Sequence, residues 1–328
     1  MAQIFAYIVH RAGVPDDSAA ELAAAARKID AAASPTAIVT GCGPELDGVC
    51  SALRASYAEV WKFANDALTH PNAELIRKAL VKILPPASIL LLTHDHLGID
   101  LSPGLSIKLN AAYLSDVLGI EGIEGAHLRV IRQEFGGQVS SHVRCDISSG
   151  AVITIRPGAF KPLESALLNG TVIEKSSEAG ALTAGRRYLQ MIAAEAGDVD
   201  ITKHNVLVSI GRGIQERENV AVAEELADAL GGAVSCSRPV VDAKWLEKSR
   251  QVGSSGKTVK PKLYLACGIS GAFQHLAGIK GSPFIIAINK NPKAPIFQVA
   301  DVGIVDDILE FLPQLTSKVR EMQGVRPK

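Results

Sequence analysis

The sequence predicts an α/β protein with two doubly wound, parallel-sheet (Rossmann-like) domains, the first with an antiparallel hairpin extension. Three observations lead to this fold class. Short apolar runs alternate with helical stretches from residue 3 to about 118, and again from His204 onward. Between these stretches the pattern changes to β-rich segments joined by glycines. The chain has 328 residues, of which 47% are hydrophobic, and this is enough to fill two cores.

The first half of the chain is predicted to consist of strands separated by helices. Residues 19–33, AAELAAAARKIDAAA, are mostly strong helix formers, and a later leucine repeat has helical spacing. The expected strands are Ile4–Val9, Thr36–Thr40, Val60–Phe63 and Ser88–Leu92, and the repeat consists of Leu101, Leu105, Leu109 and Ala112.

The middle of the chain has a different composition. Segments 127–135, 138–146 and 151–157 are β-rich and are separated by a Gly-Gly pair and a Ser-Ser-Gly turn. We expect them to form the antiparallel extension of the first domain. Residues 185–197, GRRYLQMIAAEAG, are expected to form a helix that leads to a connector. These patterns predict an amino-terminal domain over 1–195 and a carboxyl-terminal domain over 196–328.

The second half predicts another parallel sheet. Its strands are NVLVSI (205–210), GAVSC (232–236), LYLAC (263–267) and FIIAIN (284–289). Its helices are ENVAVAEELADAL (218–230), one opened by GISGAFQH (268–275), and a final one with Val305, Ile308, Leu309 and Leu312 in register before Pro313 disturbs it.

Charge and composition argue against several classes of partner. Lys plus Arg and Asp plus Glu are both 34, and a net charge of zero gives no long-range attraction for nucleic acid. No apolar run approaches the ~20 residues that a membrane span needs, and the amino terminus lacks a basic leader. The five cysteines form no CxxC pair and fit buried thiols in a reducing compartment, so we expect a cytoplasmic protein.

A metal site has weak support. His94, Asp95 and His96 are adjacent, and two histidines beside an aspartate could bind a metal. Such close spacing with no further ligand in view is more often an exposed polar loop, so we expect no metal.

Polar and glycine residues follow each strand of the second predicted sheet. They are Gly211-Arg212-Gly213, Ser237-Arg238, Gly268-Ile269-Ser270-Gly271 and Asn289. Ligands of open parallel sheets bind beyond the carboxyl ends of the strands, where free N–H groups and glycines favour a phosphate. Each glycine loop alone is more often a simple turn, and no G-x-G-x-x-G or P-loop pattern occurs. Four such loops together favour a pyrophosphate site.

His275 and Arg238 each have two readings. A histidine in the first turns of a helix is disfavoured as a cation, so a neutral, structural ring is one reading. If His275 faces a ligand whose negative charge grows on reduction, it can instead donate a hydrogen bond to that ligand. An arginine after a strand is usually a solvated loop charge, but its planar guanidinium can also lie on an aromatic ring system.

Four stretches carry a resemblance to a known family. SIGRG (209–213), SRPVVDAKW (237–245), QVGSSGKTVKPKLYLACGISGAFQHLAG (251–278) and AINKNPKAPIFQVADVGIVDDILEFLPQL (287–315) resemble the carboxyl-terminal FAD-binding domain of electron transfer flavoprotein α subunits, the FixB-like family. In the first domain THDHLGIDLSPGLSIKLNA (93–111), FGG (135–137) and TIRPGAF (154–160) resemble the family's amino-terminal pattern.

The resemblance implies a set of FAD-binding residues. Arg238 is expected over the isoalloxazine ring, Ser255 near flavin N5 and His275 at the pyrimidine edge. Ser270 is expected at the phosphates, and Asn289 and Asp307 at the adenosine half, although an acidic residue at a helix start also has a purely structural reading. The full set is Arg212, Ser237, Arg238, Gly253, Ser254, Ser255, Gly268, Ser270, Gln274, His275, Asn289 and Asp307.

Two positions depart from the family's pattern. The family usually has a long amide side chain at the position of Ser254, and a glycine at the position of Lys244. The first change leaves the flavin potential open, and the second fits a solvated loop.

The resemblance also implies partners. The chain would pair with an electron transfer flavoprotein β subunit through its first domain. Its FAD would carry electrons between dehydrogenases, such as acyl-CoA dehydrogenases, and a quinone reductase or other acceptor. The chain would be a redox carrier with no catalytic residue of its own. Whether the complex is a simple carrier or splits the electron pair of NADH stays open, because those sites lie mainly on the β subunit. We expect the second domain to move as a rigid body, with hinges near 195–205 and at the carboxyl terminus.

Two other classes remain as alternatives. An NAD-dependent dehydrogenase would need a glycine-rich fingerprint and a downstream acidic residue, which the sequence lacks. An adenine-nucleotide-binding regulatory subunit would explain the phosphate edge but would leave Arg238 and His275 without a role.

Overall fold

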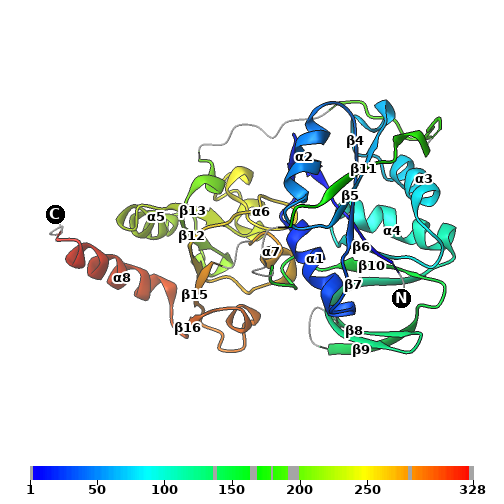
Figure 1. Cartoon of the computed structure of the whole chain (residues 1–328). Helices are drawn as coiled ribbons and strands as arrows, with labels where there is room; N and C mark the ends of the chain where they lie inside the picture. Colours follow the sequence, from blue (N-terminus) through cyan, green and yellow to red (C-terminus); the bar gives the residue numbers. More distant parts are fainter. Residues whose placement is uncertain are drawn as a thin grey trace. The chain divides into compact units, whose positions relative to one another are not determined.

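The computed structural model divides the chain into two compact units, residues 1–190 and 191–328, and each is considered by itself (Figure 1). The described residues are 3–135, 139–162, 168–178, 180–190, 199–279 and 283–324. The boundary expected between residues 195 and 196 lies outside them. Both units are α/β, with a largely parallel sheet in the first and a fully parallel sheet in the second, so the predicted fold class is confirmed.

The first unit contains a nine-stranded sheet in the order β11-β5-β4-β1-β6-β10-β7-β8-β9. A short antiparallel pair, β2 (His10–Arg11) and β3 (Val14–Pro15), forms a separate two-stranded sheet. The parallel strands that include the predicted ones are β1 (Ile4–Tyr7), β4 (Thr36–Gly41), β5 (Glu59–Ala64), β6 (Ile89–Thr93), β10 (Ala151–Ile155) and β11 (Thr171–Glu174). The helices are α1 (Ser18–Ile29), α2 (Glu45–Leu53), α3 (Ala73–Ile83) and α4 (His96–Leu109).

Helices cover both faces of this sheet, as Figure 1 shows for α1 and α2 on one side and α3 and α4 on the other. Successive residues of a strand point to opposite faces, so Ile4 and Ala6 of β1 join the core beneath α1 and α2, whereas Phe5 and Tyr7 join the other core. Both cores are therefore supplied by the same continuous apolar strand.

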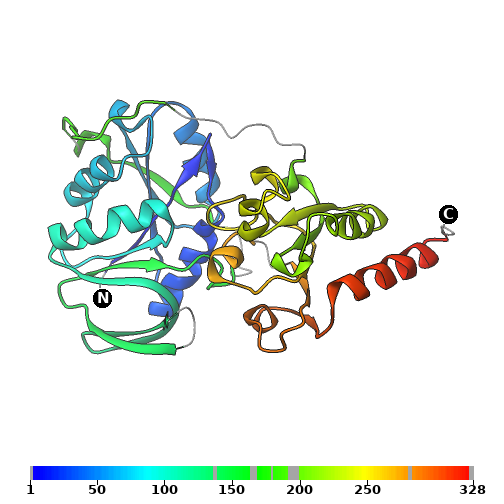
Figure 2. The same cartoon turned by 180° about the vertical axis from the view of Figure 1, so that it is seen from behind.

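The antiparallel extension is longer than the sequence predicts, and its three strands are not the three that were predicted. It consists of β7 (Ala112–Glu124), β8 (His127–Glu134) and β9 (Val139–Asp146), and β9 ends the sheet (Figure 2). The prediction that Ala112 belongs to a helix is wrong, because α4 ends at Leu109 and Asn110 takes a left-handed conformation with φ 51°.

The prediction of an antiparallel strand over 151–157 is also wrong. Strand β10 pairs in parallel with both β6 and β7. All five of its residues are buried, and an unbroken apolar run such as Ala151–Ile155 is typical of a parallel strand covered on both faces.

The second unit contains a five-stranded parallel sheet in the order β13-β12-β14-β15-β16. Its strands are β12 (Val206–Ile210), β13 (Ala233–Cys236), β14 (Leu263–Cys267), β15 (Phe284–Ile288) and β16 (Val302–Ile304), and β16 was not predicted. The helices are α5 (Val220–Ala229), α6 (Arg238–Asp242), α7 (Phe273–Leu276) and α8 (Ile308–Met322), of which α8 packs on α5. Strands β13 and β14 lie on opposite sides of β12, so the chain reverses its direction of travel across the sheet at β12.

Three helix predictions need correction. Helix α7 begins only at Phe273, because Gly268 and Gly271 before it have φ values of 64° and 85° that a helix does not allow, and it is a single turn. Helix α8 begins at Ile308, after a cap by Asp307, so Val305 lies outside it, and α8 continues through Pro313 to Met322. Residues 185–190 are not helical, and the rest of the predicted helix over 185–197 lies outside the described residues.

The two tryptophans are divided between the units. Trp61 in β5 lies 4.8 Å from Phe5 between ring centroids, and the Lys175 ammonium lies 4.5 Å from the centre of the indole. Trp245 is partly buried against the core that α5 and α8 share. Within the described ranges, no helix is both long and apolar enough to cross a membrane. All five cysteines are free thiols.

Candidate functional site

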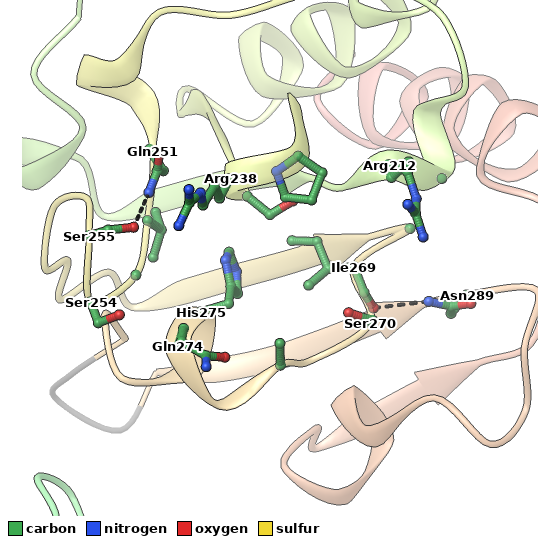
Figure 3. A pocket seen from close by; sticks show the side chains of 17 residues that line it. Arg212, Arg238, Gln251, Ser254, Ser255, Ile269, Ser270, Gln274, His275 and Asn289 are labelled. Atoms are coloured by element: carbon green, nitrogen blue, oxygen red, sulfur yellow. Dashed lines mark hydrogen bonds between the residues drawn. The ribbon is translucent and has the colours of Figure 1, made fainter. Parts of the chain in front are cut away.

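A cavity of about 630 Å³ lies at the carboxyl edge of the second sheet (Figure 3). The loops after β12, β13, β14 and β15 all contribute to it, and residues 251–255 form a further wall. Every predicted site residue except Asp307 lines it. The lining residues outside the predicted FAD-binding set are Gly213, Pro239, Gln251, Val252, Ile269 and Ala272, of which Gly213 and Ile269 belong to the strand-end loops that predicted the pyrophosphate site.

Glycines bring two backbone segments into close contact on one side of the cavity. A Cβ added to Gly213 would lie 2.7 Å from the Cα of Gly268, and one added to Gly211 would lie 2.3 Å from its carbonyl oxygen. Gly268 itself has φ 64°, which favours glycine. The crossing therefore requires glycine at all three positions, and it exposes backbone rather than side chains to the cavity. Such a surface suits a phosphate group.

Two arginines make the cavity electropositive. Arg212 follows β12, and Arg238 begins α6 with a side chain that is 70% exposed. The Nε of Arg238 lies 3.4 Å from an Asp242 carboxylate oxygen, an exposed pair that solvent screens strongly. None of the described residues that line the cavity is acidic. An anionic ligand would therefore meet two cations and no opposing carboxylate.

Two hydrogen bonds hold the wall that residues 251–255 form. The buried Gln251 side chain, 3% exposed, donates from Nε2 to the Ser255 hydroxyl at 2.8 Å (Figure 3). The Ser254 amide donates to the Gln274 carbonyl at 2.7 Å. Ser254 and Ser255 are exposed at the cavity.

The opposite wall follows β14 and β15. Asn289 donates from Nδ2 to the Ile269 carbonyl at 2.9 Å, which joins the ends of these two strands (Figure 3). The Ser270 carbonyl accepts from the Ile296 amide at 3.0 Å, and the Ser270 side chain remains exposed at the cavity. Gln274 is also exposed there. The Ser270 and Gln274 side chains make no hydrogen bond with the residues that the structure describes, so they can bind a ligand without breaking a structural contact.

His275 is the buried titratable group of the cavity. Its side chain is 6% exposed, and Nε2 lies 2.8 Å from the Tyr264 hydroxyl. Burial lowers the pKa of His275 to about 4, an effect that the backbone of Val252 partly offsets, so the ring is neutral at pH 7. Its Nδ1 is buried and has no hydrogen-bond partner in the described part of the chain. A buried nitrogen of this kind is available to a ligand that enters the cavity.

Asp307 does not line the cavity. It caps α8 by accepting a hydrogen bond from the Leu309 amide at 3.0 Å, and it pairs with the Lys290 ammonium at 2.7 Å. The lysine holds the pKa of the Asp307 carboxyl below its usual value. This is the structural role that an acidic residue at a helix start commonly has.

In the segment His94–His96 of the first unit, His94 and Asp95 make structural hydrogen bonds. His94 Nδ1 lies 2.9 Å from the Thr154 hydroxyl, and Asp95 caps α4 by accepting from the Gly98 amide at 2.8 Å. Among the described residues, no group of three potential metal-ligating side chains comes together.

The fold and the cavity define a nucleotide-cofactor domain of the doubly wound class, with glycines, hydroxyls and guanidinium groups at its switch point. Residues 200–280 match the family model "Electron transfer flavoprotein FAD-binding domain", and residues 4–196 match "Electron transfer flavoprotein domain". The chain belongs to the electron transfer flavoprotein α-subunit family, as its motifs predicted, and FAD is its cofactor.

Several relatives match almost the whole chain. The electron transfer flavoprotein subunit alpha of Methylophilus methylotrophus is 35% identical over 324 residues, 97% of this chain and 99% of the relative. That of Mycobacterium leprae is 34% identical over 332 residues, 99% of this chain and 100% of the relative. The protein FixB of Clostridium saccharobutylicum is 34% identical over 283 residues, 85% of each chain.

The residues present fit FAD. The glycine crossing leaves open backbone for phosphates, the two arginines complement their charge, and the unpartnered Nδ1 of His275 is a polar atom that a ligand could satisfy.

Proposed function

We propose that this chain pairs with an electron transfer flavoprotein β subunit and that the complex carries electrons between a dehydrogenase and an acceptor. The observation that supports this most is the cavity. It gathers the arginines, serines and histidine expected around FAD, and no acidic residue lines it among those described. FAD supplies the electron-transfer chemistry when bound. The protein supplies binding, orientation and electrostatics.

We assign roles within the cavity as part of this proposal. Gly211, Gly213 and Gly268 would admit the phosphates, with Arg212 and Ser270 completing their shell. Arg238 would leave its weak pair with Asp242 and cover the isoalloxazine ring. Ser237, Gly253, Ser254, Gln274 and Asn289 would complete the contacts with the cofactor. Asp307 would act on the cofactor only indirectly, by holding the end of β15 through Lys290.

Ser255 would donate its hydroxyl proton toward flavin N5. Its oxygen already accepts from the Gln251 amide, so the proton is free for a ligand. The Gln251 amide would in this way hold the Ser255 hydroxyl in position for the ligand.

The visible spectrum tests this function directly. The chain is coexpressed with its β subunit and purified without added cofactor. A flavin absorbance band, with FAD released on denaturation, supports the proposal. A colourless protein that retains AMP would favour the regulatory subunit, and one that retains NAD would favour the dehydrogenase.

The partners in electron transfer belong to the same proposal. Acyl-CoA dehydrogenases are proposed donors and a quinone reductase is the proposed acceptor. Reduction of the purified complex by each candidate donor, followed at the flavin band, tests them singly. Titration with NADH distinguishes a simple carrier from a bifurcating complex, since bleaching of two flavins by NADH is expected only in the second.

We further propose that the complex works in the cytoplasm, which the five free thiols support, and that residues 196–328 move as one body about hinges at 195–205 and at the carboxyl terminus. Fractionation of cells tests the location. A cross-link between the two units tests the motion, because unchanged rates of interprotein reduction in the cross-linked protein would contradict it.

A further inference from the structure

We propose that a groove in the first unit is a second ligand site, which binds an organic phosphate through the cations of α3 and α4. The groove has a volume of about 420 Å³ and is lined by α3, the last turn of α4 and residues 181–183. Small-molecule sites typically have volumes of ~300–1,000 Å³. All of its lining residues belong to the first unit, so the inference does not depend on the FAD cavity.

The groove carries an excess of positive charge. One face of α3 contributes residues at helical spacing, which are Glu74, Arg77, Lys78, Val81 and Lys82. Lys108, in the last turn of α4, adds a fourth cation to the three of α3. Glu74 is the single acidic residue among the described residues that line the groove. A ligand that complements this surface is therefore an anion.

The carboxylates nearest to these cations already have partners. Glu74 pairs with the Lys78 ammonium at 3.4 Å, and Asp100 of α4 pairs with Arg186 at 2.5 Å. Lys108 forms no ion pair with any residue that the structure describes, and its side chain is exposed at the groove. The charge of Lys108 is therefore available to a ligand, and lysine is a common binder of phosphate.

Arg77 is held in place by the backbone of α4. It donates from Nη2 to the Asp100 carbonyl at 2.9 Å and from Nε to the Leu101 carbonyl at 3.4 Å. A Cβ added to Gly104 would lie 2.7 Å from the Arg77 Cζ, so the glycine leaves room for the guanidinium on this helix. A guanidinium has more N–H groups than these two bonds use, so Arg77 can also donate to a phosphate from a fixed position.

Residues 181–183 form the remaining wall and make it partly apolar. The Lys78 ammonium donates to the Thr183 carbonyl at 2.5 Å, which attaches this segment to α3. Leu182 is 9% exposed and belongs to the core on which α3 and α4 pack, and Val81 is 37% exposed at the groove. A lone phosphate would leave these apolar groups in water, whereas a ring or chain attached to the phosphate would cover them. This favours an organic phosphate over the inorganic ion.

Lysine labelling of the full chain in its complex tests the site. The protein is acetylated in the presence of ADP, inorganic pyrophosphate or adenosine, and mass spectrometry measures the labelling rate of each lysine. ADP at ten times its Kd is expected to slow the labelling of Lys78, Lys82 and Lys108 by about tenfold. Pyrophosphate should protect the same lysines only at higher concentration, and adenosine should not protect them. The position of the protected lysines distinguishes this groove from ADP bound elsewhere in the complex.

K108Q is the test variant and K28Q its matched control. Lys108 and Lys28 are exposed lysines in the last turn of α4 and of α1, and of the two only Lys108 lines the groove. K108Q should raise the ADP concentration that protects Lys78 and Lys82 by about tenfold, and K28Q should leave it unchanged.

Three results would overturn the inference. They are no protection of these lysines by ADP, equal protection in K108Q and wild type, and protection by adenosine as strong as by ADP. Equal protection by pyrophosphate and ADP would contradict the apolar part of the site. The flavin absorbance of the same samples reports on the FAD cavity, so a failure of the proposed function is recognised separately.

Discussion

At the carboxyl edge of the first sheet polar side chains hydrogen-bond one another, whereas at the same edge of the second sheet they line a cavity. In the first unit Tyr7 pairs with Thr40 and Thr93 with Ser18, each at 2.8 Å between hydroxyl oxygens. In the second unit Arg212, Ser255 and Ser270 are exposed at the cavity.

The glycines account for much of this difference. Gly211, Gly213 and Gly268 let the backbone of the second unit approach itself and leave space above it. The first unit instead has large polar side chains at its strand ends, such as Arg156, which binds Asp116 through two nitrogens. The residues that follow the strands therefore contribute to the difference between the two carboxyl edges.

Filling the glycine crossing should have the largest effect. In G213V the new Cβ would lie 2.7 Å from the Gly268 Cα, a contact that only backbone movement can relieve. FAD affinity is expected to fall at least ~100-fold, about 3 kcal/mol. Equilibrium dialysis of FAD measures it. G48A is the control, since a Cβ there meets nothing within 4 Å in α2, and it should retain FAD. Full affinity in G213V would contradict the proposed phosphate position.

Protonation of His275 at acid pH should lower the free energy of unfolding of the second unit. The folded pKa of about 4 lies below the unfolded value of ~6.5, so the folded state binds fewer protons between these values. The contribution of the neutral His275 ring to the free energy of unfolding is fully present above pH 6.5. It is lost as the pH falls toward 4, and the total loss is ~3 kcal/mol. Urea unfolding at pH 7 and pH 5 measures it. H275Q has no titrating ring and should lose about 2 kcal/mol less than wild type over this interval. Equal losses would show that His275 is not buried neutral.

Two arginine variants compare the carboxyl edges of the two sheets in their effects on stability and on FAD binding. R156Q removes a part-buried ion pair with Asp116 and should lower the free energy of unfolding by ~2 kcal/mol without changing FAD affinity. R238Q removes an exposed pair and should change stability by less than ~0.5 kcal/mol while weakening FAD binding. Denaturant unfolding and FAD titration of both variants measure the four values. Loss of FAD binding in R156Q would contradict the contrast between the edges.

The smallest effect is expected at Asp307. D307A removes the cap of α8 and should lower the free energy of unfolding by about 1 kcal/mol. FAD affinity should stay within about twofold of wild type, because Asp307 does not line the cavity. D307N can still cap the helix and serves as the comparison. A large loss of FAD affinity in both variants would return Asp307 to the cofactor site.

Much of the cavity was predictable because one geometric rule governs it. Arg212, Ser237, Ser270 and Asn289 each follow a strand of a parallel sheet, so their positions in the sequence place them at one edge. The family motifs added residues 253–255 and 274. Gln251 was missed because its side chain enters the cavity through a loop whose path depends on hydrogen bonds to Ser255 and Lys257.

The errors arose where local pattern and three-dimensional context disagree. Ala112 continues a helical repeat, yet the left-handed Asn110 ends α4 two residues earlier. Residues 151–155 follow two antiparallel segments along the chain, but the space between β6 and β7 accommodates them in parallel. Tyr264 looked like one more apolar residue of a strand, and only the fold brings its hydroxyl to His275.

The placement of one tryptophan in each unit gives the protein two separate optical reporters. Trp61 contacts a ring and an ammonium group in the first core, whereas Trp245 packs on the second. Replacing either indole by phenylalanine would leave a single emitter, so the melting of each half could be followed alone. Because each half has its own core, their emission curves can differ in midpoint even though they belong to one polypeptide.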